Sequence, residues 1–479
     1  KLGGVSAFTY ILPGFLFHLI GGYYTYRIAR LFHGREAAWL SVLVYVSVYH
    51  LMDSSIEVKA ETYLTGFIMG ACYYWLRYDA QTKIKYLLLG ALFSACAVMT
   101  KGVFTLITIT SGLVCMWMYQ KQWSKLWSGK WLLAFVLSLL FTAPEVIALY
   151  LQFDSHPEKA VFGQSQVSGI RFFLWDSQFG RFFNTGPIKN TNGHPFYFVL
   201  VFLWAFLPWV AVFVAAMVSG VRKFFAKDRG ERAGFVFLCG AFFITFLLFS
   251  ATSFQLDHYT VILFPFAAIL CGKFLHDWLG QGQGRTLFIA QLAITILLVV
   301  LAVGLGVYVA NPIVTTVVLA LFAGLLGYGY VTRKQLRAGA VLIYPVFGIA
   351  MLYAFLGLTN ALTFTSVSVA HNAGVQLAGK PEASVYAYRM DIVARELGLY
   401  HRGPCYAVDD AAQLPKSGSY YLLVSGEHLA QLAGQLGNVE TVAQGKWVVH
   451  KTGTFPRFLR LAKGTEPLED IRIVLISAK

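Results

Sequence analysis

Residues 84–119 of this chain read IKYLLLGALFSACAVMTKGVFTLITITSGLVCMWMY. Two apolar runs, 84–100 and 103–119, are separated only by a turn at Lys101 and Gly102, and the gap before them, Arg77–Lys85, contains three basic residues. Each run has the length that a helix needs to cross a hydrocarbon core, roughly 17–25 residues. The stretch therefore predicts a helical hairpin in a membrane, with the basic gap at one face and the short turn at the other.

The same alternation of basic and sparse gaps continues along the whole chain. Six gaps hold 19 of the 38 Lys and Arg residues, whereas the short gaps between them hold only Lys59 and Lys101. Lys and Arg beside a span resist translocation, so an excess of them marks cytoplasmic loops. The gaps assigned to the cytoplasm are Arg27–Arg35, Arg77–Lys85, Lys121–Lys130, Arg222–Arg232, Lys273–Arg285 and Arg333–Arg337.

The composition indicates a polytopic membrane protein. Of the 479 residues, 57% are hydrophobic and 13% are charged, and the mean hydropathy is +0.61, whereas soluble domains contain roughly 25% charged residues. The net charge of +15 predicts anionic lipid headgroups as partners. Nucleic acid is excluded as a partner, because no basic patch with stacking aromatics lies outside a span. The six cysteines show no CxxC or zinc spacing, so neither a disulfide framework nor a metal site is predicted.

Twelve apolar segments are predicted to cross the membrane. They lie near 6–31, 36–51, 61–78, 84–100, 103–119, 131–151, 196–219, 234–250, 257–274, 286–308, 312–331 and 339–360. Counting crossings from the cytoplasmic gap Arg27–Arg35 places every basic gap inside and the gaps 52–60, 100–102, 152–195, 251–257 and 309–311 outside. Everything after Leu358 is then also outside.

Two stretches are too polar for the membrane. Residues 152–195 form a long outer loop in a transmembrane domain, 1–360, and residues 361–479 form a separate extracytoplasmic domain. A small α/β domain is expected in this tail, with strands at 383–388, 405–408, 420–424 and 446–450 and helices at 391–399 and 427–436. Ser425 is the predicted cap of the last helix.

Ionisable residues at the outer ends of spans are costly unless they pair or serve a site. The first group comprises Asp53, Glu57, Lys59 and Glu61. Its carboxylates can hold a hydroxyl, an amine or a divalent cation, and the alternative is a solvated loop with ordinary acids at a helix start. Lys101, in its tight turn, either reaches lipid headgroups or contacts a phosphate.

Two further groups lie on the same predicted face. Arg181 and His194 stand among aromatic residues of the outer loop, where a guanidinium can bind phosphate through two hydrogen bonds; the alternative is an amphipathic loop on the bilayer surface. His258 and Tyr259 begin a span, where a helix N-terminus favours an anion, or they belong to an aromatic belt. Together the four groups suit transfer from a lipid-linked phosphate, because a carboxylate can deprotonate the acceptor and cations can stabilise the leaving phosphate.

These stretches, in this order, resemble the type C membrane glycosyltransferases, in particular the branch of bacterial protein mannosyltransferases and the lipid A aminoarabinose transferase. Thr100-Lys101-Gly102 is similar to the "LTKG" turn of that branch, and Arg181-Phe-Phe with Gly193-His194-Pro195-Phe-Tyr and Phe206-Leu-Pro-Trp209 is similar to "RF…HPxxYY…FLPW". Ser253–Tyr259 with Pro265 resembles "SKLPHYLLPALP". The resemblance covers about residues 1–275, with Gln255, Asp257 and Glu61 standing where the family has lysine, proline and aspartate.

The resemblance implies a fold of about thirteen spans, a polyprenyl-phosphate sugar as donor and a location in the bacterial inner membrane. Relatives have a first outer loop with a catalytic aspartate. We expect this sequence to begin at the family's second span, so that the first span, its loop and that aspartate precede Lys1. An extracytoplasmic α/β domain also occurs in relatives.

The sequence thus predicts an inverting membrane glycosyltransferase that moves a sugar to a lipid, glycan or protein acceptor. The residues predicted to bind the donor phosphate are Lys101, Arg181, His194, His258 and Tyr259, and those predicted near the acceptor or sugar are Glu61 and Asp53. No cofactor is predicted beyond an optional divalent cation at 53–61. The alternative functions are a lipid flippase, which would need ionisable residues near the middle of spans, and a non-catalytic cell-envelope scaffold.

Overall fold

The computed structural model of the chain describes residues 7–57, 59–159, 161, 164–185, 193–225, 232–281, 284–359, 366–447, 455–465 and 467–478. The chain forms two compact units. The helical unit comprises Tyr10–Leu297 and Tyr328–Ile349, and the mixed unit comprises Lys1–Thr9, Leu298–Gly327 and Ala350–Lys479.

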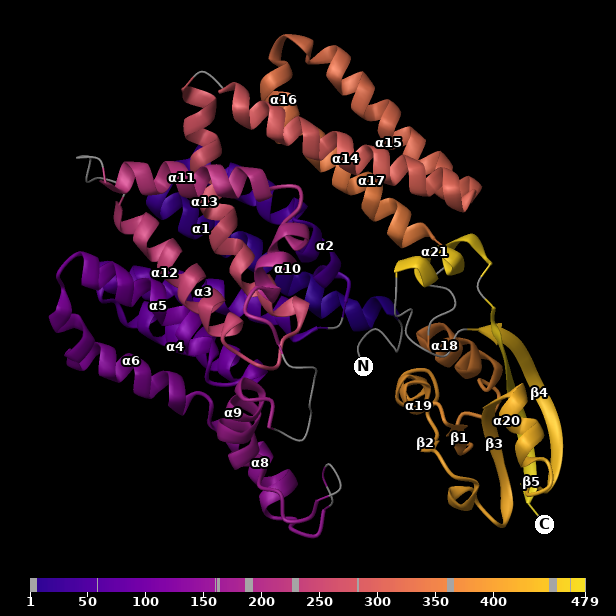
Figure 1. The fold of residues 1–479 in the computed structure, drawn as a ribbon. Helices are drawn as coiled ribbons and strands as arrows, with labels where there is room; N and C mark the ends of the chain where they lie inside the picture. Colours follow the sequence, from indigo (N-terminus) through magenta and orange to yellow (C-terminus); the bar gives the residue numbers. More distant parts are fainter. Residues whose placement is uncertain are drawn as a thin grey trace. The chain divides into compact units, whose positions relative to one another are not determined.

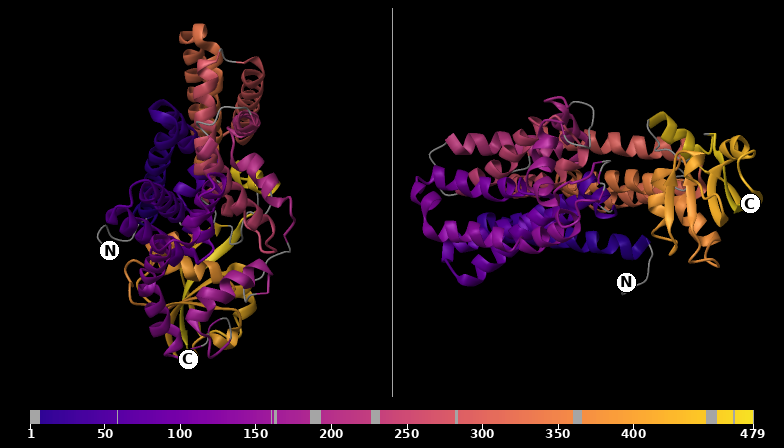
Figure 2. Two further views of the ribbon diagram at one scale, coloured as in Figure 1. Left: turned by 90° about the vertical axis from the view of Figure 1, so that its left-hand side faces the viewer. Right: turned by 90° about the horizontal axis from the view of Figure 1, so that it is seen from below.

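The helical unit is a bundle that contains the two runs predicted at 84–100 and 103–119 (Figure 1). They form α4 (Ile84–Lys101) and α5 (Thr105–Tyr119), but each packs mainly on another helix: α4 packs along α3 (Ala60–Gln81), and α5 packs against α12 (Arg232–Ser250). Figure 2 shows the neighbouring helices of this region, in purple, running side by side. A continuous apolar core joins these helices with Trp209 and Phe264.

The first helix, α1 (Ala7–Ser47), is interrupted inside the first basic gap. Gly34 has φ +83° and lies outside helical geometry, so two helical segments meet there. Glycine adopts this positive φ without the clash that a Cβ would cause. The break lies between the first two predicted spans, and α2 (Tyr49–Ser55) follows.

The span predicted at 196–219 is divided in the structure. The helices α10 (Tyr197–Ala205) and α11 (Val210–Phe225) meet at an angle of 113°. Pro208 lies at the break, where it lacks the N–H that a continuous helix requires. The break is held by buried contacts: the Trp209 indole N–H donates to Ser47 Oγ at 2.9 Å, and Gln291 Nε2 donates to the Pro208 carbonyl at 2.8 Å.

The predicted outer loop contains short helices rather than irregular chain alone. Those described are η2 (Tyr150–Asp154), α8 (Gly169–Arg171), η3 (Phe172–Asp176) and α9 (Ser177–Phe182). Residues 186–192 of the loop lie outside the described residues. The other helical elements before the tail are η1 (Trp123–Trp127), α6 (Gly129–Leu140), α7 (Ala143–Leu149), η4 (Asp257–Leu263), α13 (Phe264–Gly280), α14 (Arg285–Val309), α15 (Pro312–Val331), η5 (Arg333–Gln335), α16 (Leu336–Leu342) and α17 (Tyr344–Leu358).

The twelve predicted spans all fall on helices, but fewer than twelve of these helices are long and apolar enough to cross a membrane. Within the described residues, seven helices are long and apolar enough to cross a membrane, and eight if the bent α10–α11 pair is one span. The chain is therefore an integral membrane protein with several apolar spans. The count of twelve exceeds this number because helices such as α5 are shorter, and it stays a prediction.

The mixed unit contains a five-stranded sheet with strand order β2-β1-β3-β5-β4. Its strands are β1 (Val385–Tyr388), β2 (Cys405–Val408), β3 (Gly418–Ser425), β4 (Asn438–Trp447) and β5 (Glu469–Ala478). The first three are parallel to one another, and β5 and β4 are added antiparallel. Because side chains alternate along a strand, Tyr421 and Leu423 belong to one core and Leu422 and Val424 to another.

Helices pack against both faces of this sheet (Figure 1). One core includes residues of α18 (Ser366–Gln376) and α19 (Asp391–Leu397), and the other includes Leu432 of α20 (Gly426–Leu432). The short helix η7 (Ala411–Gln413) and the helix α21 (Phe455–Lys463) complete the unit.

The predicted tail elements are confirmed in kind. The strand at 405–408 and the start of the helix at 391 agree, and Ser425 caps α20 by accepting from the His428 amide. The strand predicted at 446–450 actually runs over 438–447, and its last three predicted residues lie outside the described chain. The sequence did not predict β5 or most of β4, and β4 is an exposed edge strand with little apolar alternation.

Candidate functional site

Glu61 and Lys101 meet at one end of the α3–α4 hairpin. Glu61 lies in the first turn of α3, where the helix dipole favours a carboxylate, and Lys101 is the last residue of α4. The Lys101 ammonium forms an ion pair with the Glu61 carboxylate. The two side chains are only 14% and 3% exposed, so each charge depends on the other for compensation.

The turn that carries Lys101 requires glycine. Gly102 has φ +100°, and a Cβ there would lie 2.1 Å from Nε2 of Gln178, a residue of α9. The turn is closed by hydrogen bonds on both sides, from the Gly102 amide to the Val98 carbonyl at 2.7 Å and from the Thr105 hydroxyl to the Gly102 carbonyl at 2.9 Å. The outer-loop helix therefore packs directly on the turn that positions the lysine.

His258 lies between two carboxylates. Its Nδ1 is 3.2 Å from Oδ1 of Asp257, and its Nε2 is 3.7 Å from Oε1 of Glu61. The same Asp257 oxygen accepts from the His258 amide at 2.7 Å, which fixes the carboxylate beside the ring. The side chain of His258 is 21% exposed, so the imidazole faces an accessible site while Asp257 holds its other edge.

Tyr259 and Arg181 complete the cationic side of the site. The Lys101 Nζ lies 4.5 Å from the centroid of the Tyr259 ring, within the range of a cation–π contact. The Arg181 guanidinium, from α9, lies close enough to Tyr259 to act on its hydroxyl, and it is 5.8 Å from the ring of Phe254. Arg181 and Lys101 therefore both lie near the same tyrosine, and Lys101 is paired with Glu61.

Backbone hydrogen bonds tie the outer loop to the segment before η4. The Ser253 and Phe254 amides donate to the carbonyls of Phe182 and Arg181, at 2.9 and 3.3 Å. The Gly193 amide donates to the Ser253 carbonyl at 2.7 Å. Three stretches that are far apart in the sequence therefore form one connected wall of the site.

His194 joins this wall through its backbone. Its amide donates to Oε1 of Gln255 at 2.9 Å, and a Cβ on Gly193 would lie 2.3 Å from Cδ of the same glutamine. The His194 side chain is exposed and accepts from the Phe196 amide at 3.2 Å. Among the described contacts, the His194 ring has none with Lys101 or Arg181.

Asp53 belongs to a second acidic group beside the first. It lies in α2, and the negative charges of Glu57 and Asp257 act on its carboxyl, against the positive charge of Lys59. Burial, reinforced by Glu57, raises the pKa of Asp53 to about 6. Glu57 itself forms an ion pair with Lys59.

Most of the predicted site residues therefore converge. Glu61, Lys101, Arg181, His258 and Tyr259 form one connected cluster. The other two predicted residues differ: His194 reaches this region through its backbone, and Asp53 lies in the neighbouring acidic group. The roles of all seven residues remain predictions.

Two residues of the site carry a contact that sequence reasoning missed. Asp257 pairs with His258, and Gln178 covers the Gly102 turn. The first contact could have been predicted, because Asp257 directly precedes His258 in the sequence. The second could not, because the position of Gln178 depends on how the outer loop folds back. Within the described part of the chain, no group of three or more His, Cys, Asp or Glu side chains is arranged to hold a metal ion.

The chain is similar in sequence to known membrane glycosyltransferases. Residues 1–147 match the family described as dolichyl-phosphate-mannose-protein mannosyltransferase. An undecaprenyl phosphate-alpha-4-amino-4-deoxy-L-arabinose arabinosyl transferase of Edwardsiella ictaluri is 27% identical over 287 residues, covering 58% of this chain and 46% of the relative. One from Proteus mirabilis is 24% identical over 261 residues, covering 53% and 43%. The chain therefore spans less than half the length of these curated relatives.

Solved structures extend the likeness to the fold. The ArnT structure from Cupriavidus metallidurans bound to undecaprenyl phosphate superposes with a TM-score of 0.67 at 16% identity, covering 97% of this chain and 83% of that one. The apo structure of the same ArnT gives 0.64 at 17% identity. The chain is thus similar in sequence to these transferases and shares the fold of ArnT. The family match covers the stretch with Asp53, Glu61 and Lys101, whereas Arg181 and His258 lie beyond it.

Proposed function

We propose that the chain is an inverting glycosyltransferase of the bacterial inner membrane, which moves a sugar from a polyprenyl phosphate to a lipid, glycan or protein acceptor. The observation that carries the proposal is the convergence of Lys101, Arg181 and Tyr259 beside Glu61 at the end of an apolar hairpin. The phosphate of a polyprenyl phosphate would lie level with this end of the helices, because the polyprenyl group stays in the hydrocarbon core while the phosphate stays at the membrane boundary.

The cationic side of the site supports binding of the leaving phosphate. Lys101 supplies an ammonium, Arg181 a guanidinium that can bind two phosphate oxygens, and Tyr259 a hydroxyl close to Arg181. When the bond between the sugar C1 and the phosphate oxygen breaks, negative charge grows on the phosphate. Donors fixed in advance around that oxygen stabilise this charge in the transition state.

The acidic side supports activation of the acceptor. The acceptor hydroxyl loses its proton to a carboxylate as its oxygen forms the new bond to C1, and the polyprenyl phosphate leaves from the opposite side. Glu61 is neutralised by Lys101, so its role is to orient the lysine and His258. Asp53, with its pKa raised to about 6, is the better proton acceptor.

The proposal includes an orientation and a domain organisation. Twelve spans in a domain over residues 1–360 put the site on the extracytoplasmic face, because the six basic gaps face the cytoplasm. The α/β domain over residues 361–479 is then also extracytoplasmic. The likeness to the structures of an undecaprenyl phosphate-binding ArnT supports this arrangement.

Transfer by the purified full chain tests the function. The donors to be compared are undecaprenyl phosphate-linked aminoarabinose and polyprenyl phosphate mannose, with release of free polyprenyl phosphate as the readout. We expect Lys101→Gln and Arg181→Gln to lower turnover by about a hundredfold or more, as loss of one preorganised anion donor does. Arg171→Gln is the matched control, since Arg171 is a 75% exposed cation of the same loop.

The outcomes are separable. If neither donor is consumed by the folded wild-type protein, the transferase proposal is wrong and movement of the intact donor between leaflets becomes the function to measure. If the wild type is active but K101Q and R181Q retain full activity, the site assignment is wrong. Addition of EDTA to the same assay tests whether the carboxylates at 53–61 use a divalent cation.

A further inference from the structure

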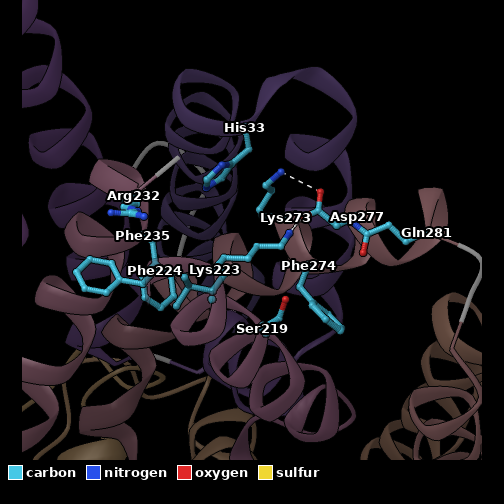
Figure 3. A pocket seen from close by; sticks show the side chains of 13 residues that line it. His33, Ser219, Lys223, Phe224, Arg232, Phe235, Lys273, Phe274, Asp277 and Gln281 are labelled. Carbon is cyan, nitrogen blue, oxygen red and sulfur yellow. Dashed lines mark hydrogen bonds and ion pairs between the residues drawn. The ribbon is translucent and has the colours of Figure 1, made fainter. Parts of the chain in front are cut away.

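A cavity of about 390 Å³ lies in the helical unit, away from the acidic site (Figure 3). Its walls come from α1, α11, α12 and α13, near the last residues of α13 and the first of α12. The acidic site lies beside the other ends of the same two helices, after Ser250 and before Phe264. At 1.5 Å per residue, the 19 residues of α12 separate the two regions by about 28 Å, close to the thickness of a hydrocarbon core.

The lining of the cavity is strongly cationic. Asp277 bridges two lysines: its Oδ2 is 2.5 Å from Nζ of Lys223, and its Oδ1 is 2.9 Å from Nζ of Lys273. Arg232 and His33 also face the cavity, as Figure 3 shows. Three permanent cations against one carboxylate leave a charge of +2 among the lining residues, before any protonation of His33.

The cation Lys223 is more exposed than the carboxylate Asp277, so an incoming anion meets a positive charge first. The Lys223 side chain is 50% exposed, whereas those of Lys273 and Asp277 are 20% and 15% exposed. The Asp277 carboxylate and Lys273 are therefore the more buried groups. The Lys223 ammonium can turn outward to a ligand while Lys273 still compensates the charge of Asp277. The Arg232 guanidinium lies 5.8 Å from the Phe224 ring, on the wall beside the lysines.

The remaining walls are apolar. Leu270, Phe274, Phe224 and Phe235 line the cavity, so it has a cationic side and an aromatic side. Gly220 lets Phe235 approach closely, since a Cβ there would lie 2.2 Å from the Phe235 ring. A lining of this kind matches an amphiphile, with its anion on the lysines and its chain against the aromatics, better than it matches a soluble ion.

We propose that this cavity binds the phosphate headgroup of an anionic membrane lipid. The basic gaps Arg27–Arg35, Arg222–Arg232 and Lys273–Arg285 supply its charged residues, and such gaps face the leaflet that attracts polybasic segments. Basic pockets between spans on that face bind phosphate headgroups. Lys223, Lys273 and Arg232 hold the phosphate, and Asp277 competes with it for the two lysines.

Lipid retention by the full chain tests the proposal. Protein in detergent micelles is titrated with dioleoylphosphatidylglycerol, with uncharged dioleoylglycerol and with inorganic phosphate, and bound ligand is counted by native mass spectrometry. We expect phosphatidylglycerol to bind and dioleoylglycerol not to bind. Lys223→Gln and Arg232→Gln each weaken phosphatidylglycerol binding by about fivefold, while Arg222→Gln, an exposed neighbour that does not line the cavity, leaves it unchanged.

Asp277→Asn gives a prediction of opposite sign. Removal of the competing carboxylate releases Lys223 from its ion pair with Asp277 and removes one negative charge from the cavity, so affinity for phosphatidylglycerol rises several-fold, which general damage to the fold would not produce. Equal retention by K223Q, R232Q and R222Q overturns the proposal, as does a fall in affinity in a folded D277N. Inorganic phosphate binding as tightly as phosphatidylglycerol would identify a soluble phosphate site and contradict the assignment to a lipid.

Discussion

At the scale of single residues, the site is a set of charges that compensate one another away from bulk water. Glu61 and Lys101 were each identifiable from the sequence as costly ions at the outer end of a span, because isolated charges there are rare without a purpose. Their pairing follows from the packing of α3 along α4, which brings the first turn of α3 to the last turn of α4. The bridging position of His258 was not predictable, because it depends on how η4 enters among the helices.

Asp53 gives a prediction that separates stability from activity. Burial and the nearby negative charges hold its pKa at about 6 in the folded state, against 3.8 for the ordinary group. The folded protein therefore binds this proton more tightly than the unfolded chain does, and ionisation costs stability as the pH rises from about 4 through about 6. Asp53→Asn removes that cost, so we expect it to stabilise the protein at pH 7.5 by about 1–2 kcal/mol, after allowance for solvent screening.

The measurement is the melting temperature of the detergent-solubilised protein between pH 4 and 8. The advantage of D53N should be absent near pH 4 and complete above pH 7, while its transferase activity is lost because the proton acceptor is gone. Glu158→Gln is a control of opposite sign, since backbone hydrogen bonding lowers the pKa of that exposed carboxyl. A gain for D53N that is the same at every pH would contradict the electrostatic explanation.

At the scale of elements, the turn between α4 and α5 is the part that the sequence predicted best and that tolerates least change. The apolar runs and the short gap are enough to define two helices and their order. The requirement for glycine at 102 comes from two sources that no periodicity reveals, a positive φ and the approach of Gln178. By contrast, the break between α10 and α11 was missed because a proline near the middle of an apolar run was treated as part of a span.

Gly102→Ala should weaken both the turn and the site. A non-glycine residue at φ +100° costs on the order of 1–3 kcal/mol, and the new Cβ displaces Gln178, so Lys101 loses its fixed position. We expect a lower melting temperature and a loss of transfer. Gly129→Ala is the matched control, because nothing lies within 4 Å of a Cβ there and its φ is ordinary.

Adding Gln178→Ala to G102A separates the two causes. The double variant relieves the contact but not the backbone strain, so it should recover part of the transfer and little of the stability. Wild-type melting and transfer in G102A alone would show that the turn does not position the lysine.

At the scale of the whole molecule, the basic gaps assign each polar region to a membrane face. The acidic site and the cationic cavity lie beside opposite ends of α12 and α13, as the alternation of gaps requires. The bent α10–α11 pair sets the parity of every crossing after it, because it is either one span or a re-entrant loop. With that pair counted, six apolar spans lie between residues 155 and 417, and without it five do.

Single cysteines measure this parity directly. Ser124→Cys lies in the basic gap 121–130, Ser155→Cys in the outer loop and Ser417→Cys in the α/β domain, and all three serines are exposed. In a Cys405→Ser background, a membrane-impermeant maleimide applied to spheroplasts should label S155C and S417C. S124C should be labelled only after the membrane is opened. Labelling of S155C without S417C would mean that α10 and α11 form a re-entrant pair, which would place the α/β domain on the cytoplasmic face, opposite the candidate site.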